Sequence, residues 1–305
     1  MANPCCVYLD GKFVDWEKAN IHILTHSLHY GTAVFEGVRA YKTKKGVAIF
    51  RAEDHAKRLV NSAKTVGLNF HLTPKKIVKI MAEAVKKNQY QSAYIRPIVF
   101  LASNVIGLSM KHTKVRFAVI VVPFTTYLGT KATNYGISCK ISPFRKIPSS
   151  SIPQTAKASA NYLVSTMATE DARNSGFDEA ILLNSKGRVA EGSGENLIIV
   201  KNGALITPPV SEDVLDGITK QAVKGIAKSL KIKFVERPIT VKELMGADEA
   251  FFSGTAAALV PITKVAGKPI GSGKPGKITK MLQSAYERAV HGEEKGFEKW
   301  LCCYM

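Results

Sequence analysis

The sequence predicts an α+β fold built from two α/β domains. Short apolar runs of strand length recur in both halves of the chain, and amphipathic helical patterns lie between them. With 305 residues, the chain is long enough for two domains with substantial cores. Polar sequence containing Gly129, which can supply a bend, separates the halves. We therefore expect a small N-terminal domain over 1–124, an interdomain loop over 125–133 and a larger domain over 134–305.

The N-terminal half is expected to mix short strands with two helices. Helical spacing of apolar residues predicts the helix over 74–88, where Pro74 suits the first turn. The other helix is predicted over 53–66. Strands are predicted over 7–13, 47–50, 93–102 and 115–123, the last two of them buried.

The second half is expected to form hairpins of an antiparallel or mixed sheet. A strand over 137–142 precedes Lys157, and a helix over about 161–174 follows it, with Gly176 able to end that helix. Predicted strands over 180–183, 196–200 and 204–206 alternate with the turn signals at 184–187 and 201–203. Another helix begins near 216–217, because apolar residues recur on one face as far as Leu230.

A formal net charge of +19 raises the question of nucleic-acid binding, because clustered Lys and Arg displace counterions from phosphates. The basic residues are instead spread from Lys12 to Lys299, and no nucleic-acid-binding motif is present. We interpret them as solvated lysines and expect no nucleic-acid partner. No apolar stretch has the length of a signal peptide or membrane span, so we expect a soluble cytoplasmic protein without a membrane partner.

The five cysteines are not a secreted disulfide framework, because their number is odd and four of them form adjacent pairs. A metal held by both pairs, Cys5–Cys6 and Cys302–Cys303, is the alternative interpretation. The Cys-x-x-Cys spacing typical of such sites is missing, so we predict reduced thiols and no metal.

Two stretches indicate pyridoxal phosphate chemistry, TAKASANYL at 155–163 and VAEGSGENL at 189–197. Schiff-base chemistry requires an amine that loses its proton and attacks a carbonyl, and the small neighbours of Lys157 leave room for a flat ring. Glu191 lies among apolar and glycine residues, where a carboxylate can pair with a ring nitrogen and favour its protonated form.

These stretches and four others resemble the branched-chain amino acid aminotransferases, a fold type IV family of pyridoxal phosphate enzymes. The other motifs, in the family's order, are HYGTAVFEGVR at 29–39 with YIRP at 94–97, GIT at 217–219, and SGTAA at 253–257. The resemblance covers nearly the whole chain. It implies a small N-terminal α/β domain and a larger C-terminal domain with a mixed or antiparallel sheet and a barrel-like core.

The resemblance also implies how the cofactor, pyridoxal 5′-phosphate, is bound. Lys157 would form the internal aldimine and then move the proton between the substrate's α-carbon and the cofactor, through a pyridoxamine phosphate form. Glu191 would meet the ring nitrogen and Tyr162 the phenolic oxygen. The phosphate would be held at the start of a helix, where free N–H groups attract anions, and by additional side chains. These phosphate contacts are Arg58, Gly217, Ile218, Thr219 and Thr255.

An aminotransferase of this kind accepts both an aliphatic side chain and the γ-carboxylate of glutamate at one site. By resemblance, Tyr94 and the N–H groups of the turn at Thr255, Ala256 and Ala257 would bind the α-carboxylate, and Arg96 and Tyr30 the distal carboxylate. The apolar lining would consist of Phe35, Tyr127, Tyr162 and Ala257. Tyr30 and Leu108 match positions that a neighbouring subunit contributes, so the active species should be at least a homodimer, and a hexamer is also compatible.

Two positions depart from the family pattern. Lys220 stands where Arg usually follows Gly-Ile-Thr, which could weaken the support of the phosphate-binding turn. Leu259 stands where Glu commonly follows Thr-Ala-Ala, which removes a structural ion pair.

The resemblance therefore predicts a transferase of branched-chain amino acid metabolism, in biosynthesis or breakdown. It would move an amino group between L-leucine, L-isoleucine or L-valine and 2-oxoglutarate. The alternatives are other fold type IV enzymes: a D-amino acid aminotransferase, an (R)-amine transaminase or aminodeoxychorismate lyase. These would share Lys157 and Glu191, but the motifs at 35–39 and 94–97 favour the branched-chain group. A non-catalytic basic binding protein is a remote alternative, which the presence of both residues opposes.

Overall fold

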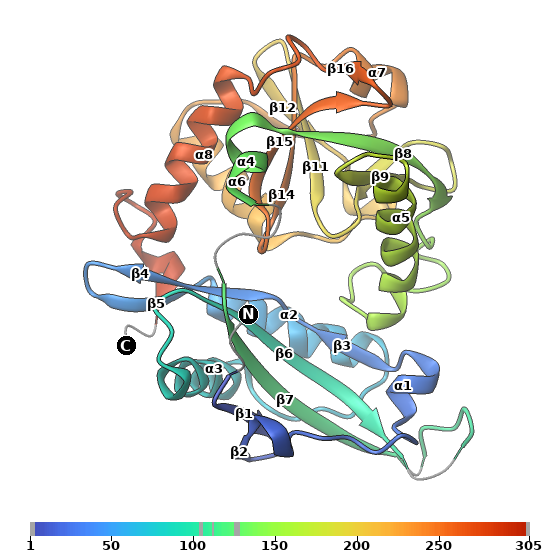
Figure 1. The fold of residues 1–305 in the computed structure, drawn as a ribbon, viewed down its shortest axis with the longest axis vertical. Helices are drawn as coiled ribbons and strands as arrows, with labels where there is room; N and C mark the ends of the chain where they lie inside the picture. Colours follow the sequence, from blue (N-terminus) through green and yellow to red (C-terminus); the bar gives the residue numbers. More distant parts are fainter. Residues whose placement is uncertain (1–3, 104–105, 112, 125–128, 303–305) are drawn as a thin grey trace. The chain divides into compact units, whose positions relative to one another are not determined.

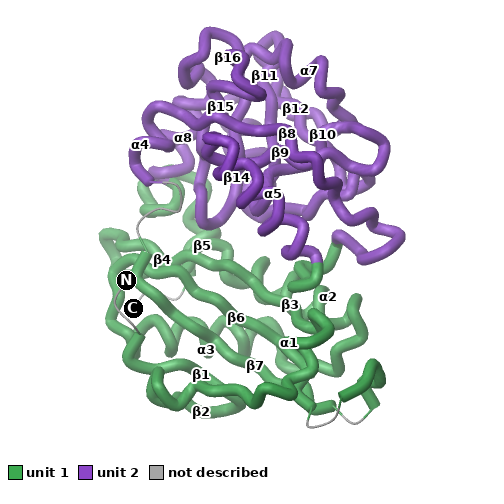
Figure 2. The backbone as a smooth tube through the Cα atoms, turned by 45° about the vertical axis from the view of Figure 1, so that its right-hand side comes forward, with its two compact units in different colours: residues 1–125, 155–160, 289–305 green, residues 126–154, 161–288 purple. Residues whose placement is uncertain are grey.

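A computed structural model describes residues 4–103, 106–111, 113–124 and 129–302. The chain divides into two compact units, each assembled from separate segments (Figure 2). Unit 1 comprises residues 1–125, 155–160 and 289–305, and unit 2 comprises 126–154 and 161–288. The segment around Lys157 and the C-terminal segment thus belong to unit 1, whereas we expected both in the second domain.

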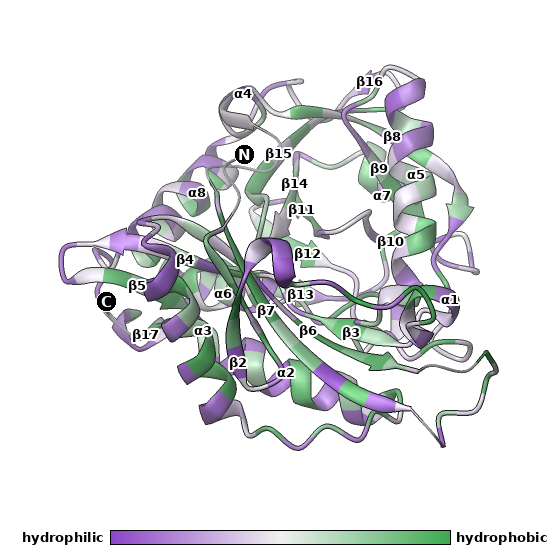
Figure 3. Cartoon of the chain, turned by 60° about the horizontal axis from the view of Figure 1, so that its bottom comes forward, coloured by the Kyte–Doolittle hydropathy of each residue, from purple (hydrophilic) through white to green (hydrophobic). Residues whose placement is uncertain are grey.

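Unit 1 is built on an eight-stranded sheet. The order is β17 (Leu301–Cys302), β5 (Gly46–Phe50), β4 (Val38–Thr43), β6 (Ala93–Ala102), β7 (Lys114–Pro123), β1 (Cys6–Leu9) and β2 (Lys12–Asp15), and β3 (Ala33–Phe35) pairs with β6. All the pairings are antiparallel. In Figure 3, β6 and β7 carry mainly the hydrophobic colour. The predicted strand over 7–13 is wrong, because Asp10 and Gly11 both have positive φ and turn the chain into the β1–β2 hairpin.

Two amphipathic helices, α2 (Ala52–Thr65) and α3 (Pro74–Asn88), pack against each other and against this sheet (Figure 1). The predicted bounds of α3 are confirmed. Thr73 caps the helix by accepting a hydrogen bond from the Lys76 N–H, and Pro74 fills the first turn, where its missing N–H costs nothing. A short helix, α1 (His26–Tyr30), precedes β3 and ends at Gly31, which has a left-handed conformation.

Unit 2 is built on a nine-stranded mixed sheet. Its order is β10 (Val189–Gly192), β9 (Glu179–Leu183), β8 (Ile137–Arg145), β15 (Ala258–Val265), β14 (Glu249–Gly254), β11 (Asn196–Lys201), β12 (Ala204–Thr207) and β13 (Phe234–Glu236), with β16 (Lys268–Pro269) beside β15. An additional pairing of β10 with β11 closes six of these strands into a ring. The prediction of a mixed sheet with a barrel-like core is therefore confirmed.

Helices surround this barrel, and one continuous apolar cluster fills much of its interior, including Leu197, Phe252 and Ile262. The helices are α4 (Gly129–Tyr135), α5 (Tyr162–Asn174), α6 (Ile218–Ser229), α7 (Val241–Met245) and α8 (Lys277–Val290). Short 3-10 turns occupy Trp16–Lys18, Ser159–Asn161, Val210–Glu212 and Glu298–Trp300. The expected interdomain loop over 125–133 differs from the structure at its second half, because α4 begins at Gly129. Among the described residues, none of the helices has the length and apolar character that a membrane span requires.

Cys6 and Cys302, one from each of the two pairs predicted as reduced thiols, lie near opposite edges of the unit 1 sheet. Four strands separate β1, which contains Cys6, from β17, which contains Cys302. A metal bound by both Cys6 and Cys302 is incompatible with this strand order. The cysteines that the structure describes are free thiols, and Cys303 lies outside the described residues.

Candidate active site

Lys157 is fixed in unit 1 by its own backbone. Its carbonyl accepts a hydrogen bond from the Phe35 N–H at 3.1 Å, and its N–H donates to the Ser62 hydroxyl at 3.0 Å. The next residue, Ala158, pairs with Val34. These contacts join a segment from the middle of the sequence to strand β3 and helix α2, which explains why Lys157 lies in unit 1.

Four of the residues predicted for the site form one cluster around the Lys157 amine. Its Nζ lies 5.2 Å from the centre of the Phe35 ring, and the Arg96 guanidinium carbon lies 4.4 Å from the same centre. Arg96 Nη2 donates to the Tyr94 hydroxyl at 2.9 Å. Gly37 is required here, because a Cβ atom at this position would overlap the Tyr94 hydroxyl. The cluster combines an amine, a guanidinium and a phenol over an aromatic ring.

The Lys157 amine is easier to deprotonate than an ordinary lysine. Burial disfavours the charged ammonium, and the positive charge of Arg58 adds to this effect, so that the pKa falls to about 8 although Glu36 opposes the change. The neutral amine is the form that attacks a carbonyl. This environment is therefore suited to the nucleophilic role predicted for Lys157.

Arg58, predicted to contact a phosphate, is anchored by a buried carboxylate. Its Nε donates to Glu36 Oε1 at 2.6 Å, and its Nη2 donates to Glu36 Oε2 at 2.9 Å. The fully buried Glu36 also contacts His55 Nδ1 at 2.7 Å. Burial alone would raise the pKa of Glu36, but the charges of Arg58 and His55 dominate and hold it well below its ordinary value. This role of Glu36 was not predicted, although an acidic residue inside an apolar strand pattern was a usable signal.

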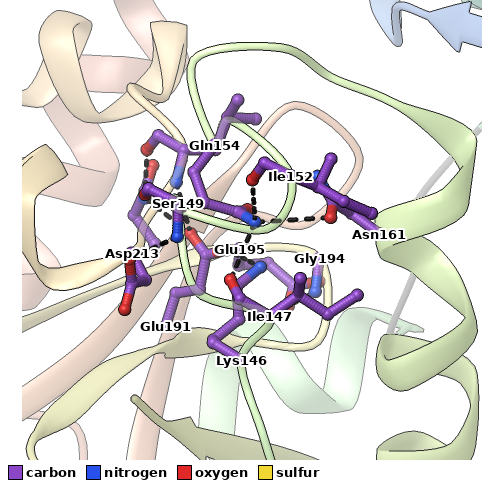
Figure 4. A network of polar contacts seen from close by, with 12 residues as sticks. Lys146, Ile147, Ser149, Ile152, Gln154, Asn161, Glu191, Gly194, Glu195 and Asp213 are labelled. Atoms are coloured by element: carbon purple, nitrogen blue, oxygen red, sulfur yellow. Dashed lines mark hydrogen bonds and ion pairs between the residues drawn. The ribbon is translucent and has the colours of Figure 1, made fainter. Parts of the chain in front are cut away.

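In unit 2, Glu191 lies on β10 and accepts three hydrogen bonds. Lys146 Nζ lies 2.7 Å from Oε1, and Oε2 accepts from the Asn196 amide at 3.2 Å and from the Leu215 N–H at 3.1 Å. Figure 4 shows Lys146 and Glu191 among neighbouring polar residues of this unit. Lys146 was not identified from the sequence, because its pairing with Glu191 depends on how β8 and β10 lie in the barrel.

The predicted phosphate-binding turn begins α6. Gly217 is the N-cap residue, and Ile218 and Thr219 form the first turn with buried side chains. A Cβ atom at position 217 would overlap Asn196 Oδ1, so the turn and the Asn196 side chain fit together only because residue 217 is glycine. Free N–H groups at the start of this helix form a site for an anion.

Lys220, the departure from the family's Arg, is almost fully buried. Its Nζ lies 3.1 Å from Asp216 and 3.3 Å from Glu236. It thus ties the first turn of α6 to β13 with a lysine in place of the family's arginine. The second expected departure was misplaced by one position, because the residue that directly follows Thr255-Ala256-Ala257 is Ala258. Leu259 itself is buried in β15.

The remaining predicted residues occupy the following positions. Thr255, Ala256 and Ala257 form the turn between β14 and β15, and Tyr162 begins α5. Tyr30 is partly buried at the end of α1, with its ring 4.6 Å from that of His26. Leu108 is 79% exposed, and Tyr127 lies outside the described residues. The structure therefore brings Lys157, Phe35, Tyr94, Arg96 and Arg58 together in unit 1, and Glu191 and the 217–219 turn together in unit 2.

The donor and acceptor groups of unit 2 fit a phosphorylated pyridine. A carboxylate has about four acceptor positions, so three donors leave Glu191 one position for a ring N–H. The Asn196 amide also donates to the Leu215 carbonyl at 2.8 Å, which links the carboxylate to the segment leading into the anion-binding turn. The ring and the phosphate of one small molecule could therefore both be held in this unit.

Comparison with known proteins shows the family. Residues 33–265 match the family described as amino-transferase class IV. A branched-chain-amino-acid aminotransferase of Pseudomonas aeruginosa is 40% identical over 294 residues, which cover 96% of this chain and 95% of the relative.

Solved structures agree with this result. A branched-chain aminotransferase of the thermophilic archaeon Thermoproteus uzoniensis, with norvaline, matches with a TM-score of 0.93 and 40% identity, covering 98% of this chain and 99% of the other. The T.th. branched-chain amino acid aminotransferase with pyridoxamine 5′-phosphate matches with a TM-score of 0.95 and 37% identity, covering 99% of each chain. The chain belongs to the class IV aminotransferases, within the group of the branched-chain-amino-acid aminotransferases.

Proposed function

We propose that this chain catalyses the reversible transfer of an amino group between L-leucine, L-isoleucine or L-valine and 2-oxoglutarate, with pyridoxal 5′-phosphate as cofactor. The observation that carries the proposal is the Lys157 amine, which has a pKa of about 8 and lies in a cluster with Phe35 and Arg96. The names of the relatives and of the structural neighbours support the choice of substrates.

The cofactor, when bound, supplies an aldehyde for the amino group and a protonated ring that withdraws electrons from the substrate's α-carbon. Glu191 would hold the ring nitrogen through its remaining acceptor position, and Tyr162 the phenolic oxygen. The phosphate would be held by N–H groups, a hydroxyl or a guanidinium of Arg58, Gly217, Ile218, Thr219 and Thr255.

Lys157 performs two tasks in this proposal. Its neutral amine would hold the cofactor through the aldehyde carbon. As a free amine, it would take the proton from the substrate's α-carbon and later give it up, which is the role of a general base and acid.

Arg96 explains how one pocket would accept both leucine and glutamate. Its guanidinium is stacked on Phe35 and donates to Tyr94, so the charge is partly satisfied when an aliphatic side chain is present. With glutamate, the same group would pair with the γ-carboxylate, helped by Tyr30. Tyr94 and the turn formed by Thr255, Ala256 and Ala257 would bind the α-carboxylate.

We further propose a homodimer, formed through the apolar surface of unit 1. A cavity of about 540 Å³ opens between residues that include Trp16, Phe100 and Ile120. Leu28, which also lines it, is 59% exposed, and the nearby chain exposes Ile23 by 70%. Apolar surface of this kind is typical of protein interfaces. A second copy covering it would let Tyr30 and Leu108 complete the partner's site.

The dimer is tested with Leu28→Asp, which places a charge in this surface. Sedimentation should show the mass of the variant falling to that of one chain, with loss of activity at the same concentration. A fully active monomer would contradict the proposal.

A further proposal concerns the compartment: free thiols fit the reducing cytoplasm, where a biosynthetic enzyme would act.

The function is tested by the absorption spectrum of the cofactor-loaded chain while amino acids are added separately and without an acceptor. Loss of the bound-cofactor band with both L-leucine and L-glutamate supports the proposed substrates. Loss of the band with D-alanine alone would identify a D-amino acid aminotransferase instead. Lys157→Ala should abolish turnover and the covalent attachment of cofactor that borohydride reduction makes permanent, whereas Lys140→Ala, in an ion pair with Asp171, should change neither.

A further inference from the structure

We propose that Lys146 is a positioning residue that shares the carboxylate of Glu191 with the ring nitrogen of the cofactor and sets the strength of that contact. The inference rests on the proposed function, because it assumes that pyridoxal phosphate is the bound group. It concerns a residue that the sequence motifs did not identify.

The geometry divides the Glu191 carboxylate between two kinds of donor. The Lys146 ammonium lies 2.7 Å from Oε1, whereas Oε2 accepts from the Asn196 amide and the Leu215 N–H. Both ends of the ion pair are buried, with 8% of the Lys146 side chain and 9% of the Glu191 side chain exposed. Solvent therefore screens this pair weakly, and the Lys146 ammonium would repel a second cation that binds to the same carboxylate.

The chain around Lys146 holds the ammonium in this place. The Lys146 N–H donates to the Leu183 carbonyl of β9 at 2.9 Å, directly after β8 ends. The following loop is closed by the Gln154 amide, which donates to the carbonyls of Ile147 at 2.9 Å and Ile152 at 3.1 Å (Figure 4). Lys146 is thus anchored on both sides, unlike a surface lysine that moves freely in solvent.

One consequence follows from a fixed ammonium at a buried carboxylate. In the loaded chain, the two cations share one carboxylate, so the contact to the ring is weaker than a carboxylate without Lys146 would make.

The test compares the affinity of the cofactor-free, full-length chain for pyridoxal phosphate and for its 1-deaza analogue, in which the ring nitrogen is a carbon. Binding is followed by fluorescence quenching, so no turnover is required. In the original chain, Lys146 still pairs with Glu191 when the analogue is bound. In Lys146→Met, the analogue leaves the buried carboxylate without any cation, so the preference for pyridoxal phosphate should rise by about tenfold or more.

Two further variants distinguish charge from packing. Lys146→Arg keeps a cation at this position, so its preference for pyridoxal phosphate over the analogue should equal that of the original chain. Lys146→Gln keeps a hydrogen-bond donor but no charge, so its preference should rise. This variant allows the test even if Lys146→Met folds poorly. Lys140→Met is the matched control, since it removes another lysine of the same strand region from its pair with Asp171, and it should leave the preference unchanged.

The outcomes separate the inference from the proposed function. An original chain that binds neither compound would overturn the proposed function and the inference with it. An original chain that binds both, while Lys146→Met and Lys146→Gln weaken both affinities by the same factor, would overturn the inference alone. A Lys146→Arg variant that behaves like Lys146→Met would do the same.

Discussion

Substitution Glu36→Gln would remove the negative charge that organises the polar part of unit 1. Glu36 is fully buried and holds Arg58 through two hydrogen bonds, of 2.6 and 2.9 Å, and His55 through one of 2.7 Å. Glutamine has nearly the same shape, but its amide has one acceptor oxygen and presents N–H groups to donors. The guanidinium of Arg58, 13% exposed, would keep its charge without the carboxylate.

The expected loss of stability follows from this uncompensated charge. Breaking a buried ion pair from one side costs about 3–5 kcal/mol. With a urea dependence of about 2 kcal/mol per molar, the unfolding midpoint should fall by roughly 1.5–2.5 M. The same change should lower the pKa of Lys157 further, because Glu36 raises it more than any other charge does.

The loss of stability can be measured on the cofactor-free chain at pH 7, and the pKa of Lys157 from the pH dependence of cofactor attachment. The chain has two tryptophans, Trp16 and Trp300, and both lie in unit 1, so their fluorescence reports the unfolding of that unit. Glu53→Gln is the matched control, since Glu53 belongs to an exposed pair on the same helix as Arg58, and it should move the midpoint little. An unchanged midpoint in Glu36→Gln, or a higher pKa of Lys157, would refute the reasoning.

Three further predictions concern the cofactor and substrate contacts. The rate of cofactor attachment should rise with pH and level off above pH 8. A pKa of about 8 leaves about a quarter of the Lys157 amines neutral at pH 7.5, whereas the ordinary pKa of 10.5 would leave about one in a thousand neutral. Stopped-flow absorbance measures the rate, and an inflection near pH 10.5 would contradict the prediction. Gly217→Ala should weaken pyridoxal phosphate binding at least about tenfold in equilibrium dialysis, because the added methyl group overlaps the Asn196 side chain. Unchanged affinity would contradict this prediction and show that the turn can move to make room for the methyl group. Gly37→Ala should displace the Tyr94 hydroxyl and raise KM for leucine and glutamate alike, with a smaller change in kcat. Steady-state assays with both donors test this. An effect on one donor only would contradict a contact of Tyr94 with the α-carboxylate of both.

Local signals in the sequence predicted part of the fold well. Helix α3 was predicted with its observed bounds, because its cap, its proline and its apolar spacing all lie within the helix or next to it. The hairpin at Asp10 and Gly11 was missed, because its apolar residues resemble one continuous strand. Helix α8 was not predicted, and its start is capped from elsewhere in the sequence: Glu249 accepts hydrogen bonds from the N–H groups of Ile278 and Thr279.

The same division holds for the site. Lys157 and Glu191 were predicted because they stand in recognisable stretches of sequence. Their neighbours Glu36 and Lys146 were not predicted, because each makes contacts with residues far away in the chain. Glu36, just after β3, binds Arg58 of α2, and Lys146, just after β8, binds Glu191 of β10. Such pairings depend on sheet order, which single-residue signals do not contain.

The discontinuous make-up of unit 1 has a consequence for the order of events during synthesis. β17 pairs with β5, although about 250 residues separate the two strands along the chain. A nascent chain therefore exposes an unpaired edge at β5 until Leu301 and Cys302 have left the ribosome. Since closing such a long loop is slow and open strand edges promote association between chains, this edge is where cotranslational chaperones would be of most use.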